Sequence, residues 1–209
     1  MRFLLILFLM LSFVSFMKCK EVHMPEKKVE RRIEKSTALK TVYLQPLGNV
    51  QQEYLQAVSS AVKDFYGYDC VIKPPVNFSD DIIAPSKTRY EASKILAKYR
   101  SKENLLILTE KDIAVKNKTR ETDEWGVLGL GYRPGTTCVV STFRMKRNAT
   151  SVKIKERLKK VALHEIGHNL GLKHCTSHPE CMMNDANGTI RQVDREKIWF
   201  CNACRVKIG

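Results

Sequence analysis

The chain has 209 residues, enough for one domain with a sizeable core, and its 44% hydrophobic and 28% charged residues are ordinary for a folded globular protein. This composition excludes collagen-like, repetitive and broadly disordered proteins. The formal net charge of +14 would suit an acidic or anionic partner. No basic and aromatic motif of a nucleic-acid-binding module is present, so we expect no nucleic-acid partner.

An apolar run near the N-terminus predicts export. Arg2 precedes the run Phe3–Met17, which has the length of a secretory signal and is shorter than the about 20 residues of a membrane-spanning helix. We therefore interpret residues 1–18 as a signal peptide, with an uncleaved signal anchor as the alternative, and expect a secreted or exported protein. Membrane attachment would require that anchor or a lipid on Cys19, and Lys18 directly before it argues against the lipid.

Alternating strands and helices follow a charged linker. Residues 19–40 are charged and poor in apolar positions, which predicts a linker, and the globular part then covers residues 41–209. Expected strands are 41–44, closed by Pro46 and Gly48, then 69–73 and 105–109; expected helices are 50–65, ended by Gly67, and 87–100. Such alternation predicts an α/β unit with a mixed sheet.

Two further strands and a long helix complete the regular part. Residues 125–132 and 137–143 predict neighbouring strands that are joined through Pro134–Gly135. Thr150 or Ser151 can cap the helix, and Gly171 is suited to end it. The buried side of this helix is expected to carry Leu158, Val161, Ala162, Ile166 and Leu170.

The long helix carries a metal-binding motif. His164 and His168 are four residues apart, so their rings share one helical face and can both reach one Zn²⁺ at about 2.0–2.1 Å. Glu165 projects beside the metal, where it can act on a bound water. Gly171 lets the chain turn back and bring His174 as a third ligand. Three protein ligands leave one position open, as catalytic zinc requires.

Four cysteines follow the histidines. Cys175 and Cys181 form one closely spaced pair, and Cys201 and Cys204 form a second pair with two residues between them. Such spacing is typical of a closed Cys₄ zinc site with a structural role. Two disulfides are the alternative in an exported chain.

The combined pattern resembles the archaemetzincin family. In that family a cysteine directly follows the third histidine, and a second cysteine, Cys-x-Met, a spacer and Cys-x-x-Cys come after it. Here the motif His164-Glu165-x-x-His168-x-x-Gly171-x-x-His174 is followed by Cys175, Cys181-Met182-Met183 and Cys201-x-x-Cys204. The 17-residue spacer, 184–200, has the expected length, whereas five residues instead of the usual four separate the first two cysteines.

The resemblance implies the fold and the cofactors. The expected fold is α/β (α+β), a metzincin-type zincin with a mixed β-sheet, a long active-site helix and a C-terminal subdomain that holds zinc through Cys175, Cys181, Cys201 and Cys204. Two zinc ions are implied, one catalytic and one structural. Met183 would supply the Met-turn beneath the catalytic zinc, and residues 41–209 would form the archaemetzincin-like catalytic domain.

These observations predict a zinc metallopeptidase with Glu165 as general base and a peptide or protein as substrate. We expect a monomer, with an exposed edge strand near 125–132 that pairs with extended substrate. One alternative is an exported, non-catalytic metal-binding or interaction protein with the same fold. A zinc ribbon for nucleic acid is another, although it leaves the three histidines unexplained.

Four other residues stay outside this account. His178 could replace a cysteine ligand but is expected to be an exposed loop residue, and Asp185 is expected to shape a turn. Cys70 and Cys138 are core thiols or, after export, a disulfide.

Overall fold

The computed structural model describes residues 40–116 and 124–208. The proposed signal (1–18) and all of the proposed linker except Lys40 lie outside the described residues, so both stay predictions. Within the described part of the chain, none of the helices combines the length and apolarity that crossing a membrane demands.

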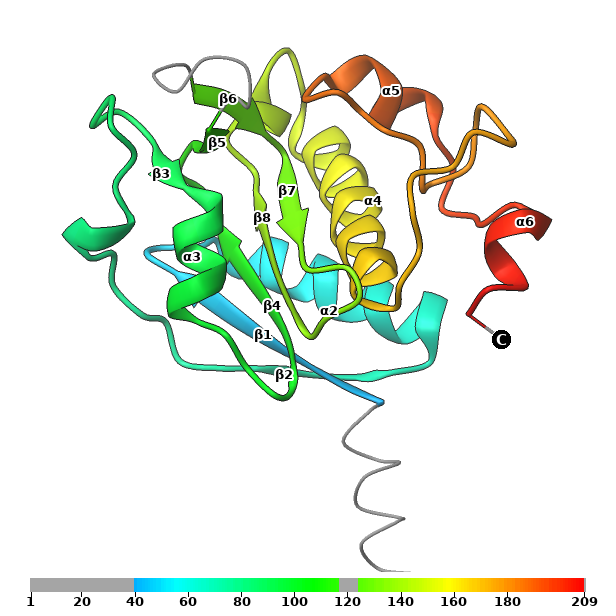
Figure 1. Ribbon diagram of the computed structural model, residues 1–209, viewed down its shortest axis with the longest axis horizontal. Helices are drawn as coiled ribbons and strands as arrows, with labels where there is room; N and C mark the ends of the chain where they lie inside the picture. The colour runs from blue at the N-terminus through cyan, green and yellow to red at the C-terminus, as the bar shows by residue number, and fades with distance from the viewer. Residues whose placement is uncertain (1–39, 117–123, 209) are drawn as a thin grey trace, which may run out of the picture.

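Eight strands, five α-helices and two short 3₁₀ helices make up the described chain (Figure 1). In chain order they are β1 (Thr41–Leu47), α2 (Gln52–Tyr66), β2 (Asp69–Ile72), η1 (Asp80–Ile82), β3 (Tyr90–Glu91), α3 (Ala92–Lys98), β4 (Asn104–Thr109), β5 (Ile113–Lys116), β6 (Glu124–Val127), β7 (Gly129–Gly131), β8 (Thr137–Ser141), η2 (Arg144–Lys146), α4 (Ser151–Asn169), α5 (Ile190–Arg195) and α6 (Asn202–Arg205).

The main sheet is mixed, as expected. Its five strands lie in the order β2-β1-β4-β8-β7, and every pairing is parallel except that of β7 with β8. A smaller sheet has the order β3-β5-β6. Because β7 is the last strand of the main sheet, one of its edges has no neighbouring strand among the residues that the structure describes, and this edge faces α4 (Figure 1).

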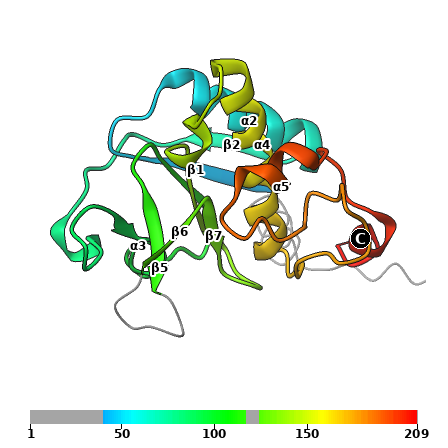
Figure 2. The ribbon, with the colours of Figure 1, turned by 90° about the horizontal axis from the view of Figure 1, so that it is seen from above.

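Helices cover both faces of the main sheet (Figure 2). Leu106 and Leu108 of β4 pack into the core on the side of α2 and α4, whereas Leu105 and Ile107 pack into the core under α3. This alternation follows from the two-residue period of a strand. A strand that is buried on both faces reads as a continuous apolar run, which explains why residues 105–109 could be predicted as a buried strand.

Three expected boundaries are wrong. Strand β1 continues through Pro46 to Leu47, which pairs with Thr109. The expected helix 87–100 is shorter, because residues 86–91 form a turn and β3 before α3 begins at Ala92. The expected strand 125–132 is two strands in different sheets, since the chain passes from β6 to β7 at the buried residue Leu128.

The long helix has the expected limits. The Thr150 side chain, rather than that of Ser151, accepts a hydrogen bond from the Lys153 N–H and caps α4. Gly171 follows the helix with φ 97°, the left-handed region that favours glycine. The predicted buried positions of α4 are buried, except that Leu170 follows the helix and is half-buried.

Candidate active site

Three histidine rings meet at one point beside α4. His164 and His168 lie one helical turn apart, and their Nε2 atoms are 3.0 Å from each other. The turn at Gly171 brings His174 back, so that its Nε2 lies 3.2 Å from Nε2 of His168. The structure therefore brings together the three histidines that the sequence pattern predicted, as a candidate metal site.

The outer nitrogens of the rings fix their orientation. His164 Nδ1 lies 2.7 Å from the carbonyl oxygen of Met182, and His168 Nδ1 lies 2.7 Å from that of Leu172. His174 Nδ1 lies 3.4 Å from a carboxylate oxygen of Asp185. Because carbonyl oxygens only accept, Nδ1 of His164 and of His168 carries the proton, and their Nε2 lone pairs face the Nε2 atom of His174.

Such a convergence of ring nitrogens fits a metal cation. Burial, and then the neighbouring His168, lower the pKa of His164 to about 3, so this ring stays neutral at physiological pH. Burial also lowers the pKa of His168. Neutral imidazoles with unprotonated Nε2 atoms are the form in which histidine binds zinc.

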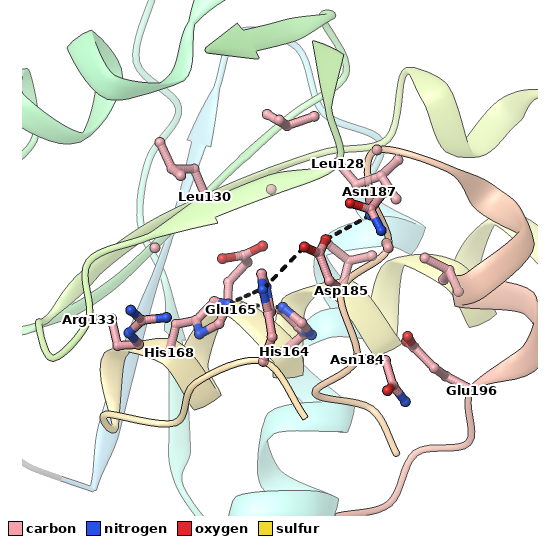
Figure 3. Close-up of a pocket in the computed structure, with 18 of the residues that line it drawn as sticks. Leu128, Leu130, Arg133, His164, Glu165, His168, Asn184, Asp185, Asn187 and Glu196 are labelled. Atoms are coloured by element: carbon pink, nitrogen blue, oxygen red, sulfur yellow. Dashed lines mark hydrogen bonds and ion pairs between the residues drawn. The ribbon is translucent and has the colours of Figure 1, made fainter. Parts of the chain in front are cut away.

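Glu165 lies on the other side of the centre, below strand β7 (Figure 3). Its side chain is buried, and within the described residues its Oε2 has no hydrogen-bond partner. Burial raises the pKa of Glu165 to about 8. A cation at the histidines would lower this pKa again, because a nearby opposite charge favours the carboxylate. The position and the pKa suit a group that exchanges protons near neutral pH.

A glycine in β7 makes room for Glu165. A Cβ added at Gly129 would lie 2.6 Å from Glu165 Oε1 and 2.9 Å from its Cδ, which is closer than non-bonded atoms pack.

We expect Gly129→Ala to push the carboxylate aside and to lower kcat/KM for peptides about 10²-fold, with the metal content unchanged. Gly67→Ala is the control: it strains a left-handed helix end far from the site and should cost stability but not activity.

Two buried methionines, Met182 and Met183, lie beside α4. Met182 and Met183 are both fully buried. The sulfur of Met183 approaches α4 at Gly167, where an added Cβ would lie 2.6 Å from Sδ. Glycine at this position, directly before His168, therefore permits the close contact between Met183 and the helix.

The four C-terminal cysteines form a second cluster. Their sulfur atoms all lie within 4.8 Å of one another. Cys175 and Cys201 have their Sγ atoms 3.5 Å apart, and those of Cys181 and Cys204 are 3.8 Å apart. A tetrahedral zinc with Zn–S bonds of about 2.3 Å separates its sulfurs by about 3.8 Å, whereas a disulfide requires about 2.05 Å. The arrangement fits a Cys₄ metal site and not the two disulfides.

Burial sets the protonation of the clustered thiols. Burial opposes ionisation of Cys175, but backbone N–H groups of Ser177 and His178 donate to its sulfur and bring its pKa down to about 7. Burial raises the pKa of Cys181 and of Cys204. Cys181 and Cys204 therefore stay thiols without a metal, and a zinc ion bound at the cluster would stabilise the thiolate form that burial disfavours.

Three other sequence interpretations are settled by position. Cys70 in β2 and Cys138 in β8 are separated by two strands, a distance of about 14 Å at 4.8 Å per strand, so no disulfide can join them. The His178 ring is half-buried and packs edge-on against Trp199, outside the cysteine cluster. Asp185 shapes a turn, as predicted, by accepting from the Asn187 N–H, but it also contacts His174.

A cavity of about 600 Å³ opens beside the three histidines (Figure 3). Its walls come from β6, β7, α4, the loop after Met183 and α5. The residues that line it include Trp125, Val127, Leu128, Gly129, Leu130, Gly131, Arg133, Val161, His164, Glu165, His168, His174, Asn184, Asp185, Ala186, Asn187, Gly188, Val193 and Glu196. The histidine centre therefore faces a space large enough for part of a peptide.

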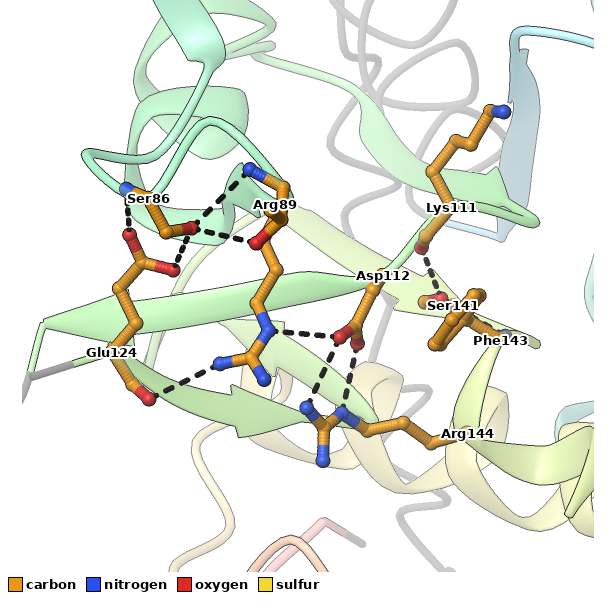
Figure 4. A network of polar contacts seen from close by, with 9 residues as sticks. Ser86, Arg89, Lys111, Asp112, Glu124, Ser141, Phe143 and Arg144 are labelled. Carbon is orange, nitrogen blue, oxygen red and sulfur yellow. Dashed lines mark hydrogen bonds and ion pairs between the residues drawn. The ribbon is translucent and has the colours of Figure 1, made fainter.

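An ion-pair network fixes the roof of this cavity (Figure 4). Asp112 accepts from Arg89 at 2.9 Å and from Arg144 at 2.8 Å, and Glu124 accepts from the Ser86 N–H. The Arg144 guanidinium lies against the backbone of Gly126 in β6, where a Cβ would overlap it. These contacts join the loop before β3, strand β6 and η2, and they hold β6 in place above the site.

Sequence reasoning missed several residues of the cavity. It did not single out Gly129, Arg133, Val193 or Glu196, which reach the cavity only through the packing of β7, α5 and the loops. Gly129 and Gly131 could have been flagged, because two glycines inside a strand often mark the close approach of another group.

A mixed sheet, a long helix with His-Glu-x-x-His and a third histidine after a glycine turn define a zinc metallopeptidase of the metzincin type. The sequence model of peptidase family M54 matches residues 52–209. An archaemetzincin from Archaeoglobus fulgidus is 31% identical over 167 residues, which cover 80% of this chain and 98% of that protein. The chain belongs to peptidase family M54, the archaemetzincins.

Other relatives and solved structures agree. The archaemetzincin of Halobacterium salinarum strain R1 is 26% identical over 171 residues, with 77% of this chain and 94% of that protein covered. The crystal structure of the A. fulgidus archaemetzincin, complexed with malonate, superposes with a TM-score of 0.71 at 31% identity over 80% of this chain and 99% of that one. That of Methanopyrus kandleri archaemetzincin has a TM-score of 0.69 at 21% identity over 82% and 94% and supports the fold.

Proposed function

We propose that this protein hydrolyses peptide bonds at the histidine centre, with zinc as the metal held by His164, His168 and His174. One observation carries the proposal: three Nε2 atoms converge beside a buried carboxylate, Glu165, at the wall of an open cavity. A binding protein with purely structural metal would have no use for a buried carboxylate without a partner, because such a group costs stability.

In this proposal Glu165 moves the protons. Zinc, when bound, lowers the pKa of a water ligand to about 7 and polarises a carbonyl group. Glu165 takes a proton from the attacking water and gives it to the leaving amine, which its position below β7 and its buried environment permit. Asp185 holds the ring of His174, the most exposed of the three histidines, from the opposite side.

Strand β7 provides a way to hold the substrate. Its free edge lies along the cavity, and Gly129, Leu130 and Gly131 are only half-buried. An extended peptide that pairs with this edge would be bound through its backbone, with its carbonyl groups passing Glu165. We propose this pairing as the mode of substrate binding.

The four cysteines have a supporting role in the proposal. Cys175 directly follows His174, and Met182 and Met183 directly follow Cys181. A second zinc at the cysteines would thus fix both the third histidine and the methionines beneath the centre. We propose one catalytic and one structural zinc per chain.

Metal removal tests the proposal. The purified protein is expected to cleave a mixed peptide library, as measured by mass spectrometry, to lose this activity in a chelator and to regain it when zinc, but not magnesium, is restored. Cleavage that persists in protein shown to be metal-free would contradict it. Absence of cleavage by the zinc-loaded protein would favour a non-catalytic metal-binding protein.

A further inference from the structure

The cavity continues from the metal centre along α4 as a pocket with apolar walls. Val161 lies one turn before Glu165 on the helix, Leu128 lies between β6 and β7, and Val193 belongs to α5. All three are buried and line the same cavity as His164. We call the part of the cavity bounded by Leu128, Val161, Val193 and Glu196 the side pocket.

A buried carboxylate closes the side pocket. Glu196 follows α5 directly, and its backbone N–H bonds to the Gln192 carbonyl at 3.1 Å. Only 4% of Glu196 is exposed, and among the described residues its Oε1 has no hydrogen-bond partner. Figure 3 shows Glu196 at one end of the cavity, with Arg133 at the other.

The charges around Glu196 leave it without a full partner. Burial raises the pKa of Glu196 to about 7, against smaller opposing contributions from Gln192 and Lys160. The ammonium of Lys160 is already bonded to Glu156 Oε1 at 2.7 Å and to the Val193 carbonyl at 3.1 Å. One carboxylate oxygen therefore remains unsatisfied, a costly arrangement for a buried group.

Helix α5 holds this carboxylate in a fixed place. Arg157 of α4 donates to both oxygens of Asp194 at 2.8 and 2.7 Å, and its Nη1 donates to the carbonyl oxygens of Met145 and Arg147. Bidentate pairs of this kind restrict orientation as well as adding stability. These contacts hold the residue that precedes Glu196 by two positions against α4, beside the side pocket.

We propose that the side pocket selects a lysine or arginine side chain next to the hydrolysed peptide bond, with Glu196 as the specificity residue. The alkyl part of such a side chain would contact Leu128, Val161 and Val193, and its cationic end would lie beside the Glu196 carboxylate that lines the pocket. Bonding to the cation would satisfy the buried carboxylate, whereas a glutamate side chain would meet like charge. The inference rests on the proposed function only in placing the side pocket next to a bond that is hydrolysed; binding of the cationic side chain does not depend on it.

Matched peptides test the selectivity in the zinc-loaded enzyme. The peptides differ at one position, tried on each side of the cleaved bond, and carry lysine, norleucine, arginine, citrulline or glutamate there. We expect kcat/KM to be at least about 10-fold higher for lysine than for norleucine and for arginine than for citrulline, since the members of each pair differ mainly in charge. Equal values for the charged and neutral members would overturn the inference.

Two variants assign the preference to Glu196. Glu196→Gln should remove the preference, so that the ratio of kcat/KM between the cationic and the neutral member of each pair falls to about 1. Glu180→Gln, which removes an exposed carboxylate paired with Lys197, should keep the full preference. A preference that survives in Glu196→Gln would overturn the inference. If that variant fails to fold, kcat/KM of the wild-type enzyme for the lysine and norleucine peptides still decides whether the pocket selects a cationic side chain.

Binding measurements separate this inference from the proposed function. Calorimetric titration of the peptides into zinc-loaded Glu165→Gln should show tighter binding of the lysine than the norleucine peptide, and Glu165→Gln/Glu196→Gln should lose the difference. Preferential binding without any cleavage by wild type would refute the proposed function alone. Binding without preference, or no binding, would refute the side pocket. N-terminally acetylated peptides should still show the preference for lysine over norleucine. Loss of the preference on acetylation would mean that the carboxylate binds a free amino terminus instead of a side chain, and would refute the inference.

Discussion

Replacing Glu165 with glutamine is expected to lower kcat/KM for peptide hydrolysis by about 10²–10⁴-fold while the protein keeps its zinc. The amide has the shape of the carboxyl group but can no longer take the proton from the attacking water. Because Glu165 Oε2 has no hydrogen-bond partner in the described chain, the substitution removes no structural contact of that oxygen and should not lower the melting temperature. Steady-state kinetics, metal analysis and thermal melting check these three expectations.

A control variant shows whether the loss of activity is specific to Glu165 or follows from removing any carboxylate of α4. Glu156→Gln changes a carboxylate on the same helix that is partly exposed and pairs with Lys160, away from the cavity. It should leave kcat/KM within a few-fold of wild type. Undiminished cleavage by zinc-loaded Glu165→Gln would exclude Glu165 as general base.

The second large effect concerns the cysteine cluster. Cys201→Ser is expected to remove one zinc per chain and to destabilise the fold by on the order of 3–5 kcal/mol, because the cluster loses one of its four ligands and metal binding contributes to folding. For a chain of this size that loss lowers the melting temperature by about 10 °C. Activity should fall as well, since His174 and Met182 are adjacent in sequence to cluster cysteines.

Cys70→Ser is the matched control for this experiment. Cys70 is a half-buried thiol in β2, outside the cluster, and its replacement should leave two zinc ions per chain. Unchanged zinc content in Cys201→Ser would refute the Cys₄ site and return the two disulfides as the explanation of the cysteine spacing.

The parts of the site that depend on local geometry were predictable from the sequence. His164 and His168 share a helical face because of their four-residue spacing, and Gly171 reverses the chain because it adopts a left-handed conformation. These rules need no knowledge of the rest of the fold. The cap at Thr150 and the buried strand Asn104–Thr109 belong to the same group.

The parts of the fold that depend on contacts between distant segments could not be predicted from the sequence. Residues 87–100 have an apolar spacing that suits a helix, but Ser86 and Arg89 bond to Glu124 and Asp112 and draw residues 86–91 into a turn and the small sheet. In the same way, only the change of sheet at Leu128 divides β6 from β7. Tertiary partners decided these boundaries, and local propensity could not reveal them.

The side pocket shows the same limit for function. Glu196 looks like one more surface glutamate in a charged sequence, and its burial arises only when α5 packs on α4 through Arg157 and Asp194. The sequence therefore predicted the chemistry of the centre but not a group that would select the substrate.

Zinc titration of the metal-free protein, with hydrolysis recorded at each addition, tests the central claim most directly. Four cysteines should bind the first equivalent, because thiolates are the stronger zinc ligands, and hydrolysis should rise between the first and second equivalents as His164, His168 and His174 fill. No hydrolysis at two bound zinc ions per chain, or full hydrolysis with the histidine centre removed by His168→Ala, would contradict the account.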